Sequence, residues 1–259
     1  MASKTKPTLL LIHGLRGNHH GLKFLEDELK NDFKIINIDL PGSGASPELP
    51  TQNLDSHIKY LHQYVTALPT KPIIVAHSMG SIIASRYASK YPDDSSHRMI
   101  LIAPILRGKA KKAADRFTYY LIKSITAPFT SKARHKLLAS KPVSFMIAHI
   151  LTYDKSKQKF ITEQHYLYSG RFASAKSLLA DLKISMTSTA IVPKSKQTLI
   201  IIGSRDQLTS PKKAKQLAVT TTSEYHEISD TGHLLNYEKP QEVANTIRDF
   251  LKSPARPSL

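Results

Sequence analysis

The chain contains no cysteine among its 259 residues, which excludes disulfide bonds and thiolate-bound metal sites. It also lacks any apolar run close to the roughly 20 residues that a membrane-spanning helix needs. The apolar run 8–12 is too short for the core of a secretory signal peptide. We therefore expect a cytoplasmic protein.

Acidic residues are scarce. There are 20 Asp and Glu against 37 Lys and Arg, which gives a formal net charge of +17. The excess is concentrated in residues 106–196, which hold 18 Lys and Arg but 4 Asp and Glu. Such a balance can attract an anionic partner. However, these lysines are scattered among apolar residues and no nucleic-acid-binding motif accompanies them, so we do not expect a nucleic-acid partner.

Strand and helix patterns alternate along most of the chain. The predicted strands span residues 8–12, 34–38, 72–76, 98–103, 198–202 and 224–228. The predicted helices between and after them span residues 21–30, 54–68 and 79–90, a helix opened by Ser210 and Pro211, and residues 240–252. This alternation predicts an α/β fold, with a mostly parallel sheet of about six strands and helices on both faces.

The alternation stops at Pro104 and resumes at residue 198. The residues between carry helix-like patterns without a convincing strand. Helices are predicted there over residues 114–126, 133–140, 143–152, 158–168 and 174–185. We therefore expect one α/β core, made of residues 1–105 and 197–259, interrupted by a helical insertion at residues 106–196.

A candidate nucleophile lies at the junction of the third predicted strand and the following helix. Residues 76–80 read Ala-His-Ser-Met-Gly, with Ser78 at the centre. A sharp turn at this junction holds the serine at the tip of the strand, and small flanking residues are needed because the backbone passes close by. The N-terminus of the helix favours negative charge that develops next to Ser78.

The loop after the first strand reads His-Gly-Leu-Arg-Gly-Asn over residues 13–18. Acyl transfer requires two N–H donors that point at the oxyanion. We predict that these are the backbone N–H groups of Leu15 and of Met79, the residue after the serine. We expect His13 to brace its loop through hydrogen bonds, because a triad does not require a second imidazole.

Asp206 and His233 follow the last two predicted strands, in the loops that begin at residues 203 and 229. Parallel strands end at the same edge of a sheet, so residues that are distant in the sequence are expected to meet there with Ser78. The order Ser, Asp, His fits the nucleophile-elbow architecture. His233 would take the serine proton, and Asp206 would fix the imidazole tautomer and stabilise the imidazolium.

Together these motifs resemble the α/β-hydrolase superfamily, in particular its lidded serine esterases and lipase-like members. The resemblance covers most of residues 7–252 outside the insertion. It rests on His13-Gly14, residues 39–44 (Asp-Leu-Pro-Gly-Ser-Gly), the Ser78 turn, Asp206 and Gly232-His233. It implies a six-stranded core, because the family's first two strands have no room before Thr8, and it implies that the insertion is the family's cap. The serine differs from the aspartate nucleophile of the dehalogenase and epoxide-hydrolase branches.

Other candidate residues fit structural roles better. The resemblance implies a structural role for Asp39, which precedes the Pro-Gly turn. Asp230 is too close in the sequence to His233 to orient its ring. His19 and His20 are adjacent in a polar loop without a nearby third ligand, so we expect no metal site.

The expected reaction is hydrolysis of a carboxylic ester through an acyl-enzyme, without cofactor. By analogy, the expected substrate is a small-molecule ester of a short-to-medium acyl chain, or one like a monoacylglycerol. The same residues leave open a thioesterase, an amidase, an acyltransferase, a carbon–carbon hydrolase and a non-catalytic receptor. We infer no obligate protein partner. We favour a solvated outer face for the basic insertion, and the alternative is attachment to anionic lipid surfaces.

Overall fold

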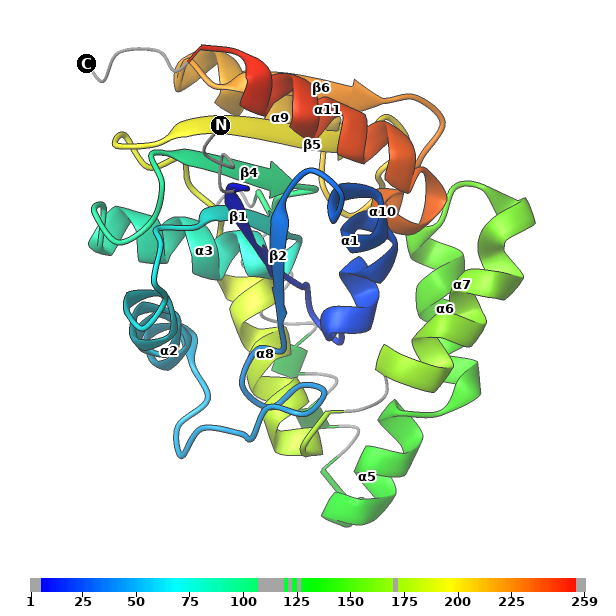
Figure 1. The fold of residues 1–259 in the computed structure, drawn as a ribbon. Coiled ribbons are helices and arrows are strands. Elements are labelled where there is room, and N and C mark those ends of the chain that lie inside the picture. The colour runs from blue at the N-terminus through cyan, green and yellow to red at the C-terminus, as the bar shows by residue number, and fades with distance from the viewer. Residues whose placement is uncertain (1–5, 107–118, 121–122, 125–126, 170–171, 255–259) are drawn as a thin grey trace.

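The computed structural model describes residues 6–106, 119–120, 123–124, 127–169 and 172–254 (Figure 1). Its centre is a six-stranded parallel sheet with the strand order β2-β1-β3-β4-β5-β6. The strands are β1 (Thr8–Ile12), β2 (Lys34–Ile38), β3 (Ile73–His77), β4 (Arg98–Ile102), β5 (Gln197–Gly203) and β6 (Glu224–Ile228). The predicted six-stranded α/β fold is confirmed, and each strand lies within one residue of its predicted bounds.

The central strands are apolar throughout because helices cover both faces of the sheet. Successive residues of β1 show this: Leu9 and Leu11 belong to one apolar cluster, and Leu10 and Ile12 belong to another. The first cluster includes α1 (Lys23–Leu29) and α11 (Pro240–Lys252), and the second includes α2 (Leu54–Thr66) and α3 (Met79–Lys90). Two layers of helix thus fix the position of the strand ends.

Local sequence sets the ends of several helices. Asn53 caps α2, where its side chain accepts the backbone N–H of Ser56 at 2.9 Å. Ser210 caps α9 (Pro211–Thr220) with Pro211 in its first turn, which confirms the predicted start of that helix. The predicted helix 21–30 is divided into a 3₁₀ helix, His19–Leu22, and α1. The helices predicted at 79–90 and 240–252 have the same bounds in the structure.

In the described part of the chain, four further α-helices lie between β4 and β5, although those strands are neighbours in the sheet. They are α5 (Ser131–Leu138), α6 (Lys141–Leu151), α7 (Gln158–Gln164), which continues into a π-helical turn, His165–Ser169, and α8 (Ala175–Thr187). In Figure 1, α5, α6 and α7 lie on the right of the view, and α8 lies below α3. Four helices predicted here are found within two residues of their expected bounds when the π-helical turn is counted with α7. The helix predicted at 114–126 falls largely outside the described residues. None of the described helices is long and apolar enough to span a membrane.

Candidate active site

Ser78 occupies the turn between β3 and α3 with φ 53° and ψ −119°. This positive φ is uncommon for a residue with a side chain, and such backbone strain concentrates at functional sites. The turn is held to the neighbouring strand, because the backbone N–H of Ser78 donates to the carbonyl of Ile102 at 3.0 Å. The structure therefore contains, at Ser78, the strained turn that the sequence predicts.

The glycines around this turn have no room for a side chain. A Cβ atom on Gly80 would lie 2.5 Å from the carbonyl oxygen of His13 and 2.7 Å from that of Ile12. A Cβ atom on Gly14 would lie 2.9 Å from the Cβ of Ser78. The loop after β1 therefore packs directly against the serine turn, and the missing side chains are what allow this contact.

The structure brings the three residues predicted at the sheet edge into one hydrogen-bonded chain. Nε2 of His233 lies 2.8 Å from Oγ of Ser78, and Nδ1 of the same ring lies 2.9 Å from Oδ2 of Asp206. All three side chains are buried. A carboxylate only accepts hydrogen bonds, so Nδ1–H donates to Asp206 and Nε2 is left to accept the hydroxyl of Ser78.

Several hydrogen bonds from its own loop stabilise Asp206 as a carboxylate. Its Oδ1 accepts the backbone N–H groups of Leu208 at 2.8 Å and Thr209 at 2.9 Å, and its Oδ2 also accepts the hydroxyl of Thr209. Burial works to raise the pKa of Asp206, but His233 and the Thr209 hydrogen bonds outweigh it and leave the pKa below its ordinary value. The acid therefore stays ionised next to the imidazole at neutral pH.

Two backbone N–H groups near Ser78 donate to no acceptor among the described residues. Met79 is the first residue of α3, and its N–H has no acceptor within the helix. Leu15 lines the same cavity as Ser78, and its N–H donates to no acceptor in the described part of the chain. These are the two groups that the sequence assigned to an oxyanion hole, and that role stays a prediction.

Two buried histidines brace the loops. The backbone N–H of Leu40 donates to Nε2 of His13 at 2.9 Å, and Nδ1–H of His13 donates to the carbonyl of Gly14 at 2.8 Å. His13 is thus a loop brace, as predicted, and burial lowers its pKa to about 4. His77 was not identified from the sequence. Its Nε2–H donates to the carbonyl of His233 at 3.0 Å, and burial lowers its pKa to about 3, which keeps it neutral.

The other acidic and histidine candidates make contacts outside the Ser78–His233–Asp206 chain. Oδ1 of Asp39 accepts the backbone N–H of His19 at 2.7 Å and Nδ1–H of the same residue at 2.8 Å. Asp230 is exposed and lies 3.8 Å from Arg205. The ring of His20 lies 4.1 Å from that of Tyr168, centre to centre. Across the described residues, no three side chains of the metal-ligating types form a cluster.

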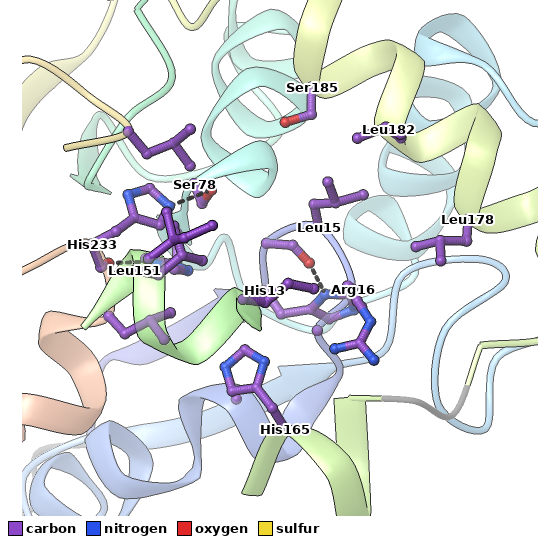
Figure 2. A pocket seen from close by; sticks show the side chains of 18 of the residues that line it. His13, Leu15, Arg16, Ser78, Leu151, His165, Leu178, Leu182, Ser185 and His233 are labelled. Atoms are coloured by element: carbon purple, nitrogen blue, oxygen red, sulfur yellow. Dashed lines mark hydrogen bonds between the residues drawn. The ribbon is translucent and has the colours of Figure 1, made fainter. Parts of the chain in front are cut away.

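A cavity of about 320 Å³ opens beside Ser78 and His233 (Figure 2). Its lining is mostly apolar, and α6, α8 and the residue after His233 contribute Val143, Ile147, Leu178, Leu182 and Leu234 to it. The carbonyl of Leu151, at the end of α6, accepts the backbone N–H of His233 at 2.8 Å. The helices between β4 and β5 therefore form one wall of the cavity and are bonded to the loop that carries the histidine.

Known proteins resemble this chain along nearly its whole length. A curated relative, the biotin biosynthesis bifunctional protein BioHC of Cellvibrio japonicus, is 22% identical over 97% of this chain and 49% of its own, so the chain spans about half of that protein. Epoxide hydrolase 3 of Xenopus tropicalis is 22% identical over 96% of this chain and 72% of its own. Human monoacylglycerol lipase ABHD6 is 25% identical over 96% of this chain and 76% of its own.

Solved structures share the same fold. A hydrolase from Pseudomonas aeruginosa PA01 superposes with a TM-score of 0.76 at 16% identity, covering 98% of this chain and 92% of its own. A thermophilic esterase from Thermogutta terrifontis gives 0.73 at 21% identity, covering 96% and 90%. The profile of the family described as the alpha/beta hydrolase fold matches residues 7–240. With its six-stranded parallel sheet and its serine turn after β3, the chain belongs to the α/β-hydrolase family.

Proposed function

We propose that the protein is a serine hydrolase that cleaves carboxylic esters through an acyl-enzyme. The observation that carries the proposal is the bond chain from Ser78 through His233 to Asp206, with contacts of 2.8 and 2.9 Å, at the wall of an apolar cavity. A serine hydroxyl is a poor nucleophile unless a base takes its proton, and this arrangement supplies the base and its orienting carboxylate.

In the proposed mechanism, Oγ of Ser78 attacks the ester carbonyl while its proton passes to Nε2 of His233. Asp206 stabilises the imidazolium, and the N–H groups of Leu15 and Met79 bind the negative oxygen of the tetrahedral intermediate. The carbon–oxygen bond to the alcohol then breaks, and the alcohol leaves with the proton from His233. Water, deprotonated by the same ring, attacks the acyl-serine, and release of the acid restores the serine proton. No step requires a cofactor.

The apolar cavity supports a substrate with a short-to-medium acyl chain or one like a monoacylglycerol. Residues 106–196 are proposed to act as a cap that supplies much of this cavity, since Val143, Ile147 and Leu178 all line it. The relation to a monoacylglycerol lipase agrees with this substrate class. A hydrocarbon chain gains free energy by leaving water for such a cavity, at about 25 cal/mol for each Å² buried.

The test is fluorophosphonate labelling together with turnover of p-nitrophenyl esters of graded chain length, beside matched thioesters and amides. We expect labelling and ester hydrolysis, with Ser78→Ala abolishing labelling and reducing turnover at least about a thousandfold. A preference for thioesters or amides would change the assigned class of reaction and keep Ser78 as the nucleophile. Neither labelling nor turnover of any substrate would point to a receptor and sink the proposal.

A second candidate property concerns the surface of the insertion. On α6, Phe145, Met146 and Ile150 are each more than half exposed, at 54%, 53% and 53%. Lys141 begins the same helix, and its Nζ lies 6.0 Å from the centre of the exposed ring of Tyr166. Exposed apolar side chains among lysines are typical of surfaces that bind anionic lipid. We propose that this surface docks on anionic membranes, where acylglycerol substrates reside.

Co-sedimentation of the Ser78→Ala protein with neutral and anionic vesicles at low and high salt tests the docking. We expect binding to anionic vesicles that fades with salt, since exposed charges are screened beyond about 10 Å at 0.1 M salt. Phe145→Ser should weaken it roughly tenfold, whereas Val219→Ser, at an exposed apolar residue of α9, should not. Binding that ignores both lipid charge and salt, or no binding, would contradict it.

A further inference from the structure

Arg16 is a buried cation in the wall of the cavity that holds Ser78. It follows Leu15 in the loop after β1, is 7% exposed, and has φ 57°, a strained left-handed conformation for a residue with a side chain. Its Nη2 donates to the carbonyl of Leu138 at 2.9 Å and to the hydroxyl of Ser144 at 3.1 Å. These two bonds use both hydrogens of Nη2 and fix the direction of the guanidinium.

The rest of the guanidinium is unsatisfied. Nε and Nη1 of Arg16 are buried, and neither has an acceptor within the described ranges. Burial is what lowers its pKa, to about 10, so the group stays charged at neutral pH, and no carboxylate among the described residues pairs with it. A buried charge without a partner is costly, and Arg16 is one of the residues that line the cavity beside Ser78.

A second unsatisfied group lines the same cavity. His165 is buried at the start of the π-helical turn that follows α7, and π-helical turns are frequent at functional sites. Both of its ring nitrogens are without a partner in the part of the chain that the structure describes. Burial, and then the charge of Arg16, lower its pKa to about 3, so the ring is neutral and offers one N–H donor. In Figure 2 the His165 ring and the Arg16 guanidinium both lie in the lower half of the view, while Ser78 lies in the upper half.

We infer that Arg16 and His165 bind a carboxylate of the substrate, so that the preferred esters carry a free carboxylate remote from the scissile bond, as the half-esters of dicarboxylic acids do. This deepens the proposed function and rests on it. The single charge of the Arg16 guanidinium balances one negative charge, and the neutral imidazole of His165 adds one N–H donor, which fits a carboxylate better than a phosphate dianion. The cavity that these residues share with Ser78 is otherwise lined mostly by apolar side chains, which suits the methylene chain that separates the two ends of such a substrate.

The test compares hydrolysis of the monomethyl and dimethyl esters of linear dicarboxylic acids of graded length. The measured quantity is the ratio of kcat/KM for the half-ester to that for the neutral diester, within each protein variant. A variant that is partly unfolded loses both rates together, so the ratio reports charge recognition alone. We expect the wild-type ratio to favour the half-ester at one or two chain lengths.

Arg16→Met, which keeps the length of the side chain but not its charge, should lower that ratio about 30-fold, as loss of one partner of a buried charge pair does. His165→Phe should lower it less, because it removes one neutral donor. Arg248→Met, on α11 and away from the cavity, removes the same charge and should leave the ratio unchanged. An equal ratio in wild-type and Arg16→Met proteins would overturn the inference. Arg16 would then have only a structural role, through its hydrogen bonds to Leu138 and Ser144.

Calorimetric titration of the Ser78→Ala protein with the same half-esters separates this inference from the proposed function. Binding that depends on the carboxylate and is lost in Ser78→Ala/Arg16→Met supports the anion site even if neither ester is hydrolysed by the wild type. Hydrolysis of the diester without any preference for the half-ester keeps the proposed function and refutes the anion site.

Discussion

The carboxylate of Glu238 accepts the backbone N–H of Gly232, the residue before His233, at 2.9 Å from Oε1. Its other oxygen, Oε2, accepts the N–H groups of Tyr153 at 3.1 Å and Asp154 at 2.7 Å, just after α6. Glu238 is 1% exposed. One buried side chain therefore joins the loop that carries the histidine to the segment that follows α6, a helix that lines the cavity.

Glu238→Gln tests this joint. A glutamine has one oxygen and one NH₂ group, so its NH₂ would face a backbone N–H and leave at least one buried donor unsatisfied. We expect the free energy of unfolding to fall by about 1–3 kcal/mol in denaturant titrations. Glu242→Gln, at an exposed position on α11, should change it by less than about 0.5 kcal/mol. Equal free energies of unfolding for Glu238→Gln and Glu242→Gln would mean that the hydrogen bonds of Glu238 contribute little to stability.

Asp206→Asn should lower the turnover of esters by roughly four orders of magnitude, because an amide would favour the wrong tautomer of His233. Asp230→Asn serves as the matched control, since Asp230 is exposed and contacts only Arg205 among the ion pairs of the described residues. Asp39→Asn should retain most of the specific activity in whatever protein folds. Similar losses of kcat for Asp206→Asn and Asp230→Asn would show that the orienting acid is misassigned.

The glycine after the serine turn can be tested in the same paired way. A methyl group on Gly80 would overlap the carbonyl oxygens of His13 and Ile12 at 2.5 and 2.7 Å, so the backbone of β1 or α3 must move. We expect Gly80→Ala to cost about 1–3 kcal/mol of stability and to reduce turnover. The nearest atom to a methyl group on Gly21 is the Tyr237 hydroxyl at 3.7 Å, an ordinary contact, and Gly21→Ala should be tolerated. Thermal unfolding of the two variants measures this difference, and equal losses of stability in Gly80→Ala and Gly21→Ala would contradict it.

The sequence predicts the sheet and the meeting of Ser78, Asp206 and His233 for one physical reason. Buried parallel strands read as continuous apolar runs, and their carboxyl ends share an edge, so a residue placed just after each run can be positioned without knowledge of the packing. The strained turn at Ser78 adds a local signature in the small residues that surround it. These features depend on chain order and short-range pattern.

Arg16 and Glu238 could not be identified in this way, because their surroundings come from distant parts of the chain. Arg16 meets Ser144 across 128 positions, and Glu238 meets Asp154 across 84. Nothing local distinguishes either from a solvated surface residue, since Arg16 sits in a polar loop and Glu238 in a four-residue helix, α10 (Leu235–Glu238). Charged residues in polar stretches are mostly exposed, and only tertiary packing reveals the exceptions.

A buried acid links α8, which lines the cavity, to α2. Oδ1 of Asp181, on α8, lies 3.4 Å from Nε2 of His57, on α2, and both side chains are buried. Nδ1–H of His57 donates to the carbonyl of Asn53 at 2.8 Å, which leaves Nε2 as an acceptor. Burial raises the pKa of Asp181 to about 8 and lowers the pKa of His57, so both are neutral at pH 7.

This pair predicts a specific dependence of stability on pH. In the unfolded chain an aspartate ionises near its ordinary pKa of 3.8, whereas Asp181 in the folded protein keeps its proton until about pH 8. The stabilisation from this proton is complete below pH 3.8 and is lost as the pH rises through 8. His57 and the other buried histidines oppose this trend below pH 6.5, where their unfolded forms gain a proton, and Lys196, whose pKa burial lowers to about 8, opposes it above pH 8, so the window from pH 6.5 to 8 is where Asp181 acts most strongly. We expect the free energy of unfolding to fall across that window.

Asp181→Asn removes the titrating proton while keeping a neutral side chain of similar shape, so the slope between pH 6.5 and 8 should become smaller. Above pH 8 the variant should be more stable than the wild type, because it has no charge to bury. Asp55→Asn, at an exposed position on the same helix as His57, controls for the loss of a negative charge and should keep the wild-type slope. The measurement is urea unfolding of the three proteins at half-unit pH steps. A slope in Asp181→Asn equal to that of the wild type would show that Asp181 is already ionised in the folded protein, with His57 carrying the proton.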